Sequence, residues 1–248
     1  MTKEERRRRE YYLARRRMRK RRRRIQIISR VLFVVILAVM AVTAVTRVAE
    51  TLGGQKKETS AKPEKLKKKT TEEFKQKVIE EEPEFSVELL TPNEYSRPQS
   101  ALEKVEGIVI HYTANPGTSA AQNRSYFESL KDTQETKASS HFIVGIEGEI
   151  IQCIPSSEIS YASNDRNYNT LSIECCHMEE DGKFTEETYR SLVELTAWLC
   201  GKFNLPVESV IRHYDVTGKK CPLYFVEHEE EWEQFQRDVQ SYLEQHGV

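Results

Sequence analysis

Residues 211–222 hold two side chains that are good metal ligands. His213 and Cys221 stand eight residues apart, and Lys219 lies two residues before the thiol. An imidazole nitrogen and a thiolate sulfur suit a borderline-soft ion such as Zn²⁺. A catalytic zinc has three protein ligands and keeps a fourth position for water, so a third ligand must come from elsewhere in the chain. His111, at the end of a short apolar run, is the best candidate.

Taken one at a time, these residues favour a structural role. A lone His after a strand is usually hydrogen-bonded, and a lone Cys is usually a small buried hydrophobe. Packing explains the joint pattern less well, because two His at strand ends are followed by a Cys after a Gly-Lys turn. We therefore predict a zinc site formed by His111, His213 and Cys221. His141 and His177 are not needed as ligands once those three are in place.

Four motifs resemble the zinc-dependent N-acetylmuramoyl-L-alanine amidases, whose fold is shared with amidase-type phage lysozymes and peptidoglycan recognition proteins. They are Ile-His-Tyr-Thr at 110–113, Ser-His-Phe at 140–142, Ser-Ile-Glu at 172–174, and the segment 213–222. The resemblance covers about residues 85–243. It implies a mixed central sheet with helices on its faces and a zinc ion in a surface groove. It also implies a cell-wall hydrolase that uses zinc-activated water to cleave the amide between N-acetylmuramic acid and L-alanine of peptidoglycan.

Amide hydrolysis also needs a group that takes a proton from water, and Glu174 is the candidate. On a strand, its side chain points to the face opposite Ile173 and Cys175. The alternative is a polar residue on a solvated strand face. The resemblance favours the catalytic role, because some relatives carry a functional Glu after a matching apolar strand. It likewise implies that Lys219 stabilises the developing oxyanion, and the alternative there is a solvated turn lysine.

Polar loops next to these motifs supply candidate substrate contacts. Asn164 and Arg166 lie in the polar loop before the strand that carries Glu174, and Asn115 lies in the loop after His111. We predict that these three side chains contact sugar or peptide. The alternative is that both loops are only solvated turns.

Short apolar strands alternate with amphipathic helices after residue 85, which indicates an α/β domain. With the sheet that the resemblance implies, the expected fold is a mixed central β-sheet flanked by helices. The expected strands are 107–112, 141–145, 149–154, 171–176 and 210–213, the second and third forming a hairpin. The expected helices are 120–130, 185–203 and 227–245, with Ser119 and Thr185 as N-caps of the first two.

The N-terminal part of the 248-residue chain has a different character. Residues 1–24 carry fourteen Lys or Arg and three Glu, a net charge of +11; because the whole chain has −1, the remainder carries −12. A mostly apolar stretch, 25–46, follows at once. About 20 residues at ~1.5 Å per residue cross a hydrocarbon core of ~30 Å. Basic residues before such a span predict a cytoplasmic N-terminus and an external C-terminal domain.

The predicted organisation is therefore a single-pass protein of the cell membrane. It has a basic cytoplasmic tail at 1–24, a transmembrane anchor at 25–46, a charged linker at 47–84 and a zinc amidase domain at 85–248. A cleaved signal peptide is the alternative, although the basic region is longer than an ordinary signal peptide carries.

Two other functions compete with the amidase. A nucleic-acid-binding protein would use the basic tail, but the adjacent apolar span already explains those charges, so we expect no nucleic-acid partner. A non-catalytic peptidoglycan-binding module anchored in the membrane would have the same fold without the metal. The ligand set and Lys219 argue against it. The expected partners are peptidoglycan, and the membrane through one N-terminal helix.

Four cysteines remain once Cys221 is assigned to the metal: Cys153, Cys175, Cys176 and Cys200. Their spacing defines no pairing. We expect reduced core residues. Cys175 and Cys176 are neighbours on a predicted strand, so they should point to opposite faces.

Overall fold

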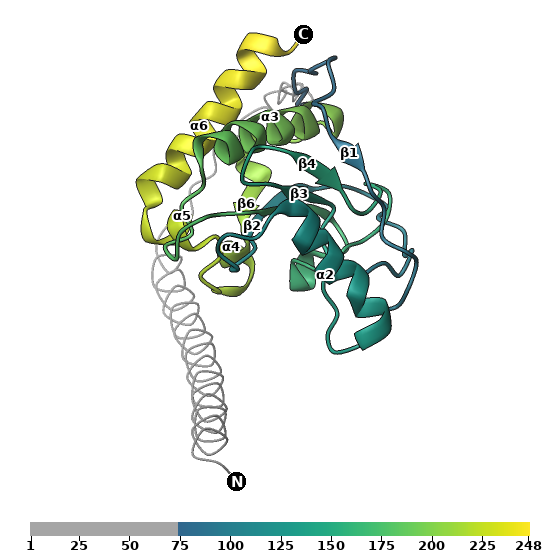
Figure 1. The fold of residues 1–248 in the computed structure, drawn as a ribbon. Coiled ribbons are helices and arrows are strands. Elements are labelled where there is room, and N and C mark those ends of the chain that lie inside the picture. Colours follow the sequence, from purple (N-terminus) through teal and green to yellow (C-terminus); the bar gives the residue numbers. More distant parts are fainter. Residues whose placement is uncertain (1–73) are drawn as a thin grey trace, which may run out of the picture. The chain divides into compact units, whose positions relative to one another are not determined.

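The computed structural model describes residues 74–248, which form a domain around one six-stranded sheet (Figure 1). The strands are β1 (Ser86–Val87), β2 (Gly107–Tyr112), β3 (Phe142–Val144), β4 (Ile150–Gln152), β5 (Thr170–Cys175) and β6 (Val210–Arg212). Across the sheet the order is β1-β4-β3-β5-β2-β6. β3 and β4 are antiparallel, and the other neighbouring strands are parallel. The predicted mixed sheet is confirmed.

Helices cover both faces of this sheet. They are α2 (Ala120–Thr133), α3 (Glu186–Lys202), α4 (His213–Thr217), α5 (Leu223–Glu227) and α6 (Glu229–His246), with short 3-10 turns η1 (Asn164–Arg166) and η2 (Val207–Ser209). In Figure 1, α3 and α6 lie together on one side of the sheet and α2 lies on the other. The architecture is therefore the predicted sheet between helical layers.

Side-chain alternation along the strands builds a separate core on each face. Ile110 and Ile173 pack with residues of α3 and α6, whereas Ile143 packs with residues of α2. Cys175 and Cys176 fall in the two different cores, as predicted. All five cysteines lie within the described part of the chain, and they are buried and form no disulfide there. The four outside the metal cluster are core residues, as predicted, and their reduced state stays a prediction.

Most predicted elements recur with small shifts at their ends. Ser119 caps α2 by accepting a hydrogen bond from the backbone N–H of Gln122, and Thr185 caps α3 in the same way. Gly148 takes φ +86° in the turn of the predicted hairpin, a conformation that favours glycine. The short helices α4 and α5 were not predicted, because five residues are too few to show a helical period.

The packed part of the chain begins before the predicted boundary at residue 85. Residues 76–82, here called the strap, run beside the C-terminal end of the chain (Figure 1). Val78 and Val248 exchange two backbone hydrogen bonds of 3.2 and 3.0 Å. Gln76 is buried and donates to a backbone carbonyl after α3, and Ile79 joins the larger core. This part of the predicted linker therefore packs against the domain.

None of the helices within residues 74–248 is long and apolar enough to cross a membrane. The predicted basic tail and membrane anchor, and the linker as far as residue 73, lie outside the described residues.

Candidate metal centre

Three neighbouring parallel strands bring the predicted site together at their carboxyl ends. His111 is the penultimate residue of β2, and His213, which follows β6, is the first residue of α4. Glu174 is the penultimate residue of β5 and is paired in register with His111. In open α/β sheets, ligands bind at the carboxyl ends of the strands. Topology and register thus place these side chains where a binding site is expected.

His111, His213 and Cys221 form a tight, buried cluster. One ligand atom from each residue lies within 4.8 Å of the other two. The Cys221 sulfur is 3.8 Å from His111 Nδ1, and the two imidazole centroids are 4.6 Å apart. The fold therefore brings the three predicted ligands together from separate segments of the chain.

The chemistry of this cluster fits a zinc ion. His213 Nδ1 is buried without a hydrogen-bond partner, which is unfavourable unless another group binds there. Burial, with the nearby charges of His213 and Lys219, holds the pKa of His111 well below its usual value. Burial also lowers the pKa of His213 to about 4, so both rings are neutral, the form that binds metals. Burial raises the pKa of the Cys221 thiol to about 12, and a bound cation would favour the thiolate instead.

Glu174 and Lys219 lie beside the cluster. Glu174 Oε2 is buried without a partner, and burial raises the pKa of this carboxyl to about 8, against the effect of Lys219. A buried oxygen does not fit the alternative of a solvated strand face. Lys219 is exposed, yet its charge lowers the pKa of both His111 and His213, so its ammonium is close to the cluster.

One short loop contacts the Nε2 atom of both imidazole rings. His111 Nε2 is 3.2 Å from Ser163 Oγ, and His213 Nε2 is 3.0 Å from Asn164 Oδ1. The sequence predicts a substrate contact for Asn164, whereas in the structure its side-chain oxygen meets a candidate ligand. Ser163 was not predicted at all, since a serine before a polar loop carries no signal for this contact.

Arg166 is turned away from the cluster. Its guanidinium lies near Gly107, the first residue of β2, and its Nε donates to Asn169 Oδ1 at 2.8 Å. His111 is four residues further along the strand, roughly 13 Å at ~3.3 Å per residue. Arg166 therefore lies apart from the metal cluster, and its contact with substrate stays a prediction. Asn115 is exposed in the loop after β2, and its contact with substrate likewise stays a prediction.

Comparison with known proteins agrees with this geometry. Residues 101–223, which include the three candidate ligands, match the family model described as N-acetylmuramoyl-L-alanine amidase. This domain belongs to the N-acetylmuramoyl-L-alanine amidase family. A probable N-acetylmuramoyl-L-alanine amidase of Bacillus licheniformis is 38% identical over 163 residues, 61% of this chain and 46% of that protein.

Two further relatives extend the comparison. The N-acetylmuramoyl-L-alanine amidase CwlL of Bacillus licheniformis is 37% identical over 164 residues, 61% of this chain and 45% of that protein. The chain thus spans about half the length of these curated relatives. The solved structure of PlyL has the same fold, with a TM-score of 0.55 at 24% identity over 63% of this chain and 97% of that one.

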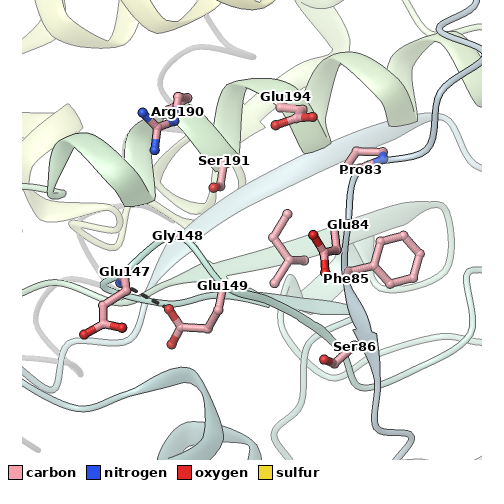
Figure 2. Close-up of a pocket in the computed structure, with 11 residues that line it drawn as sticks. Pro83, Glu84, Phe85, Ser86, Glu147, Gly148, Glu149, Arg190, Ser191 and Glu194 are labelled. Atoms are coloured by element: carbon pink, nitrogen blue, oxygen red, sulfur yellow. Dashed lines mark hydrogen bonds between the residues drawn. The ribbon is translucent and has the colours of Figure 1, made fainter.

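The amidase domain also has a separate cavity of about 650 Å³, shown in Figure 2. It lies between the segment 83–86, the turn of the β3–β4 hairpin and α3. The charged side chains that line it are Glu84, Glu147, Glu149, Arg190 and Glu194. No candidate ligand lines this cavity, so it is distinct from the metal cluster.

Proposed function

We propose that this chain is a zinc-dependent N-acetylmuramoyl-L-alanine amidase. Its substrate would be peptidoglycan, cut at the amide between the lactyl group of N-acetylmuramic acid and the L-alanine of the peptide stem. The observation that carries the proposal is the buried cluster of His111, His213 and Cys221, with Glu174 beside it. Two curated relatives that are named for this amidase activity support the choice of substrate.

The chain's own side chains divide the work of amide hydrolysis. A zinc ion held by His111, His213 and Cys221 would supply a Lewis acid for the scissile carbonyl and the attacking water. A bound cation would favour the ionised form of Glu174, and this carboxylate accepts a proton from that water as its oxygen bonds to the carbonyl carbon. The same carboxyl then gives the proton to the L-alanine nitrogen as the C–N bond breaks, leaving a free amine and a lactyl carboxylic acid. The acid then releases the second proton of the water to solvent and becomes a carboxylate. Lys219 stabilises the negative charge that develops on the carbonyl oxygen.

Zinc content and peptidoglycan digestion together test this function. The purified full-length protein should hold about one zinc, and Cys221→Ala should lose most of it. Cys200→Ala, which removes a buried thiol of α3 outside the cluster, serves as the control and should keep its zinc. Mass spectrometry should find muropeptides cleaved at the lactyl–alanine amide.

Two results would change the proposal. Unchanged zinc content in both His111→Ala and Cys221→Ala would rule out the metal site. A zinc-loaded protein that binds muropeptides and leaves them intact would favour the non-catalytic peptidoglycan-binding module.

We further propose that residues 25–46 anchor this domain at the outer side of the cell membrane, with the tail 1–24 in the cytoplasm. The support is the net charge of +11 on that tail beside the apolar stretch. Protease added to wall-stripped cells should release the domain and spare the tail. Protection of the domain would reverse the orientation, and a mature N-terminus near Ala44 would support a cleaved signal peptide.

A further inference from the structure

The loop that carries Ser163 and Asn164 lies behind both candidate histidine ligands. His111 turns Nδ1 toward the Cys221 sulfur, at 3.8 Å, and its Nε2 toward Ser163 Oγ, at 3.2 Å. His213 has Nδ1 buried without a partner and Nε2 3.0 Å from Asn164 Oδ1. In both rings Nε2 therefore contacts this loop, and Nδ1 is the nitrogen left for a metal ion.

A neutral imidazole carries one proton, so Nδ1 binds a cation only when that proton is on Nε2. A carbonyl oxygen only accepts hydrogen bonds, so Asn164 Oδ1 selects the form of His213 with the proton on Nε2. If the amide were turned, its NH₂ group would instead favour the proton on Nδ1, the nitrogen needed for the metal. Ser163 Oγ lies 3.2 Å from His111 Nε2; as a hydroxyl it can donate or accept, and it accepts when the proton of His111 is on Nε2.

We propose that Asn164 and Ser163 are positioning residues that hold His213 and His111 in the proton arrangement and ring orientation that bind zinc through Nδ1. The inference rests on the proposed zinc site. It gives Asn164 a different role from the substrate contact that its sequence context suggests.

Internal hydrogen bonds hold the loop in place for this role. Asn167 Oδ1 accepts the backbone N–H of Ser163 at 2.6 Å and that of the preceding residue at 3.2 Å. Asn164 has φ +53°, a left-handed conformation in which asparagine is enriched. Ser163 is buried, whereas the residue Asn164 as a whole is exposed. Asn164 is therefore the better position for substitution, because a change there removes little packing.

A matched pair of variants at Asn164 tests the inference. Asn164→Gly keeps the left-handed backbone and removes the acceptor, whereas Asn164→Asp keeps an acceptor oxygen. Loss of an outer partner of a ligating histidine typically weakens metal binding by roughly 10–100-fold. In chelator-competition titrations of the full-length protein, the zinc Kd should rise by that factor in Asn164→Gly. It should stay within about threefold of the parent value in Asn164→Asp, since the acceptor that sets the effect remains.

A glycine placed in the same backbone conformation elsewhere is the control. Gln134 has φ +54° at the end of α2, so Gln134→Gly should leave the zinc Kd unchanged. A parent-like Kd in Asn164→Gly, or equal weakening in the glycine and aspartate variants, would overturn the inference while the zinc site stands. A parent protein that binds no zinc would overturn the proposed function, and this inference with it.

Discussion

At the scale of single residues, the site is built from buried polar atoms that lack protein partners. His213 Nδ1 and Glu174 Oε2 are both buried and unpaired. Leaving such an atom unsatisfied costs about 1–3 kcal/mol of folding stability. Atoms held in this way are already oriented, so a metal ion and a water molecule would find their partners in place.

The role of Glu174 can be separated from that of a ligand by Glu174→Gln. The amide keeps the shape of the side chain but does not take a proton from water. General base catalysis typically contributes about 10²–10⁴-fold, so muropeptide cleavage should fall by a factor in that range while zinc content stays unchanged. Zinc analysis and a cleavage assay on the same preparation make the measurement.

Lys219→Ala is the companion variant. It should also keep zinc and lose rate, because it removes positive charge near the developing oxyanion.

If Glu174→Gln cleaves at the parent rate, the base lies elsewhere. If it loses zinc, Glu174 is a ligand or supports one.

At the scale of elements, a buried imidazole ties the hairpin to the strand that carries Glu174. His141 Nδ1 accepts the backbone N–H of Ser172 in β5 at 3.0 Å, and its Nε2 donates to the carbonyl of Glu158 at 2.8 Å. The Ser172 hydroxyl in turn contacts the hydroxyl of Ser160 at 2.8 Å. As expected, His141 is not in the metal cluster; it joins structural elements beneath the site.

This arrangement predicts a pH-dependent loss of stability. Burial lowers the pKa of His141 to about 4, although its bond to the Glu158 carbonyl opposes the shift. In the unfolded chain its pKa is about 6.5, so between about pH 6.5 and 4 only the unfolded state takes up the proton. Stability should therefore fall with decreasing pH by up to ~1.4 kcal/mol per unit across that window, then level off below it.

Denaturant unfolding of the parent and of His141→Gln at several pH values measures this effect. The difference in free energy of unfolding between the two proteins isolates the contribution of His141 from those of other groups. A difference that is constant from pH 7 to pH 4 would show that His141 is not the group responsible.

At the scale of the whole molecule, the strap joins the start of the folded domain to its end. Its contacts are with the chain terminus and with the loop after α3, far along the sequence. A Cβ at Gly201, in α3, would lie 2.7 Å from the carbonyl oxygen of Lys77, so the strap packs closely against that helix. α6 begins shortly after Cys221 and ends beside the strap, about 27 Å further at ~1.5 Å per residue. The chain therefore enters the domain well away from the metal cluster.

Truncation should show that the strap is part of the folding unit. A protein starting at residue 74 keeps the strap, whereas one starting at residue 85, the predicted boundary, loses it. Loss of the buried Ile79 and of the strap's hydrogen bonds should lower stability by about 3 kcal/mol. For a domain of this size, that corresponds to a melting temperature lower by roughly 6–12 °C. Equal melting temperatures for the two proteins would mean that the strap contributes nothing to stability.

The sequence by itself determined the features that depend on neighbouring residues. Three features depend only on residues a few positions apart: the pair His213 and Cys221, the capped starts of α2 and α3, and the hairpin turn at Gly148. The alternation of short strands with helices was enough to indicate an α/β domain, because periodicity reports which face each segment buries. The place of His111 at the end of a short apolar run made it the candidate third ligand, and the family motifs agreed with that choice.

Only the tertiary structure decided how those pieces meet. Three contacts join segments that are far apart in sequence. They are the strand pairing that sets His111 beside Glu174, the contact of Asn164 with His213, and the backbone hydrogen bonds between Val78 and Val248. The Arg166 guanidinium likewise lies near Gly107, a residue far from it in the sequence. Such contacts depend on how whole strands and helices pack. A one-residue change of register would send every side chain of a strand to the other face. The pattern within one segment does not say which segment lies beside it, so it does not determine these contacts.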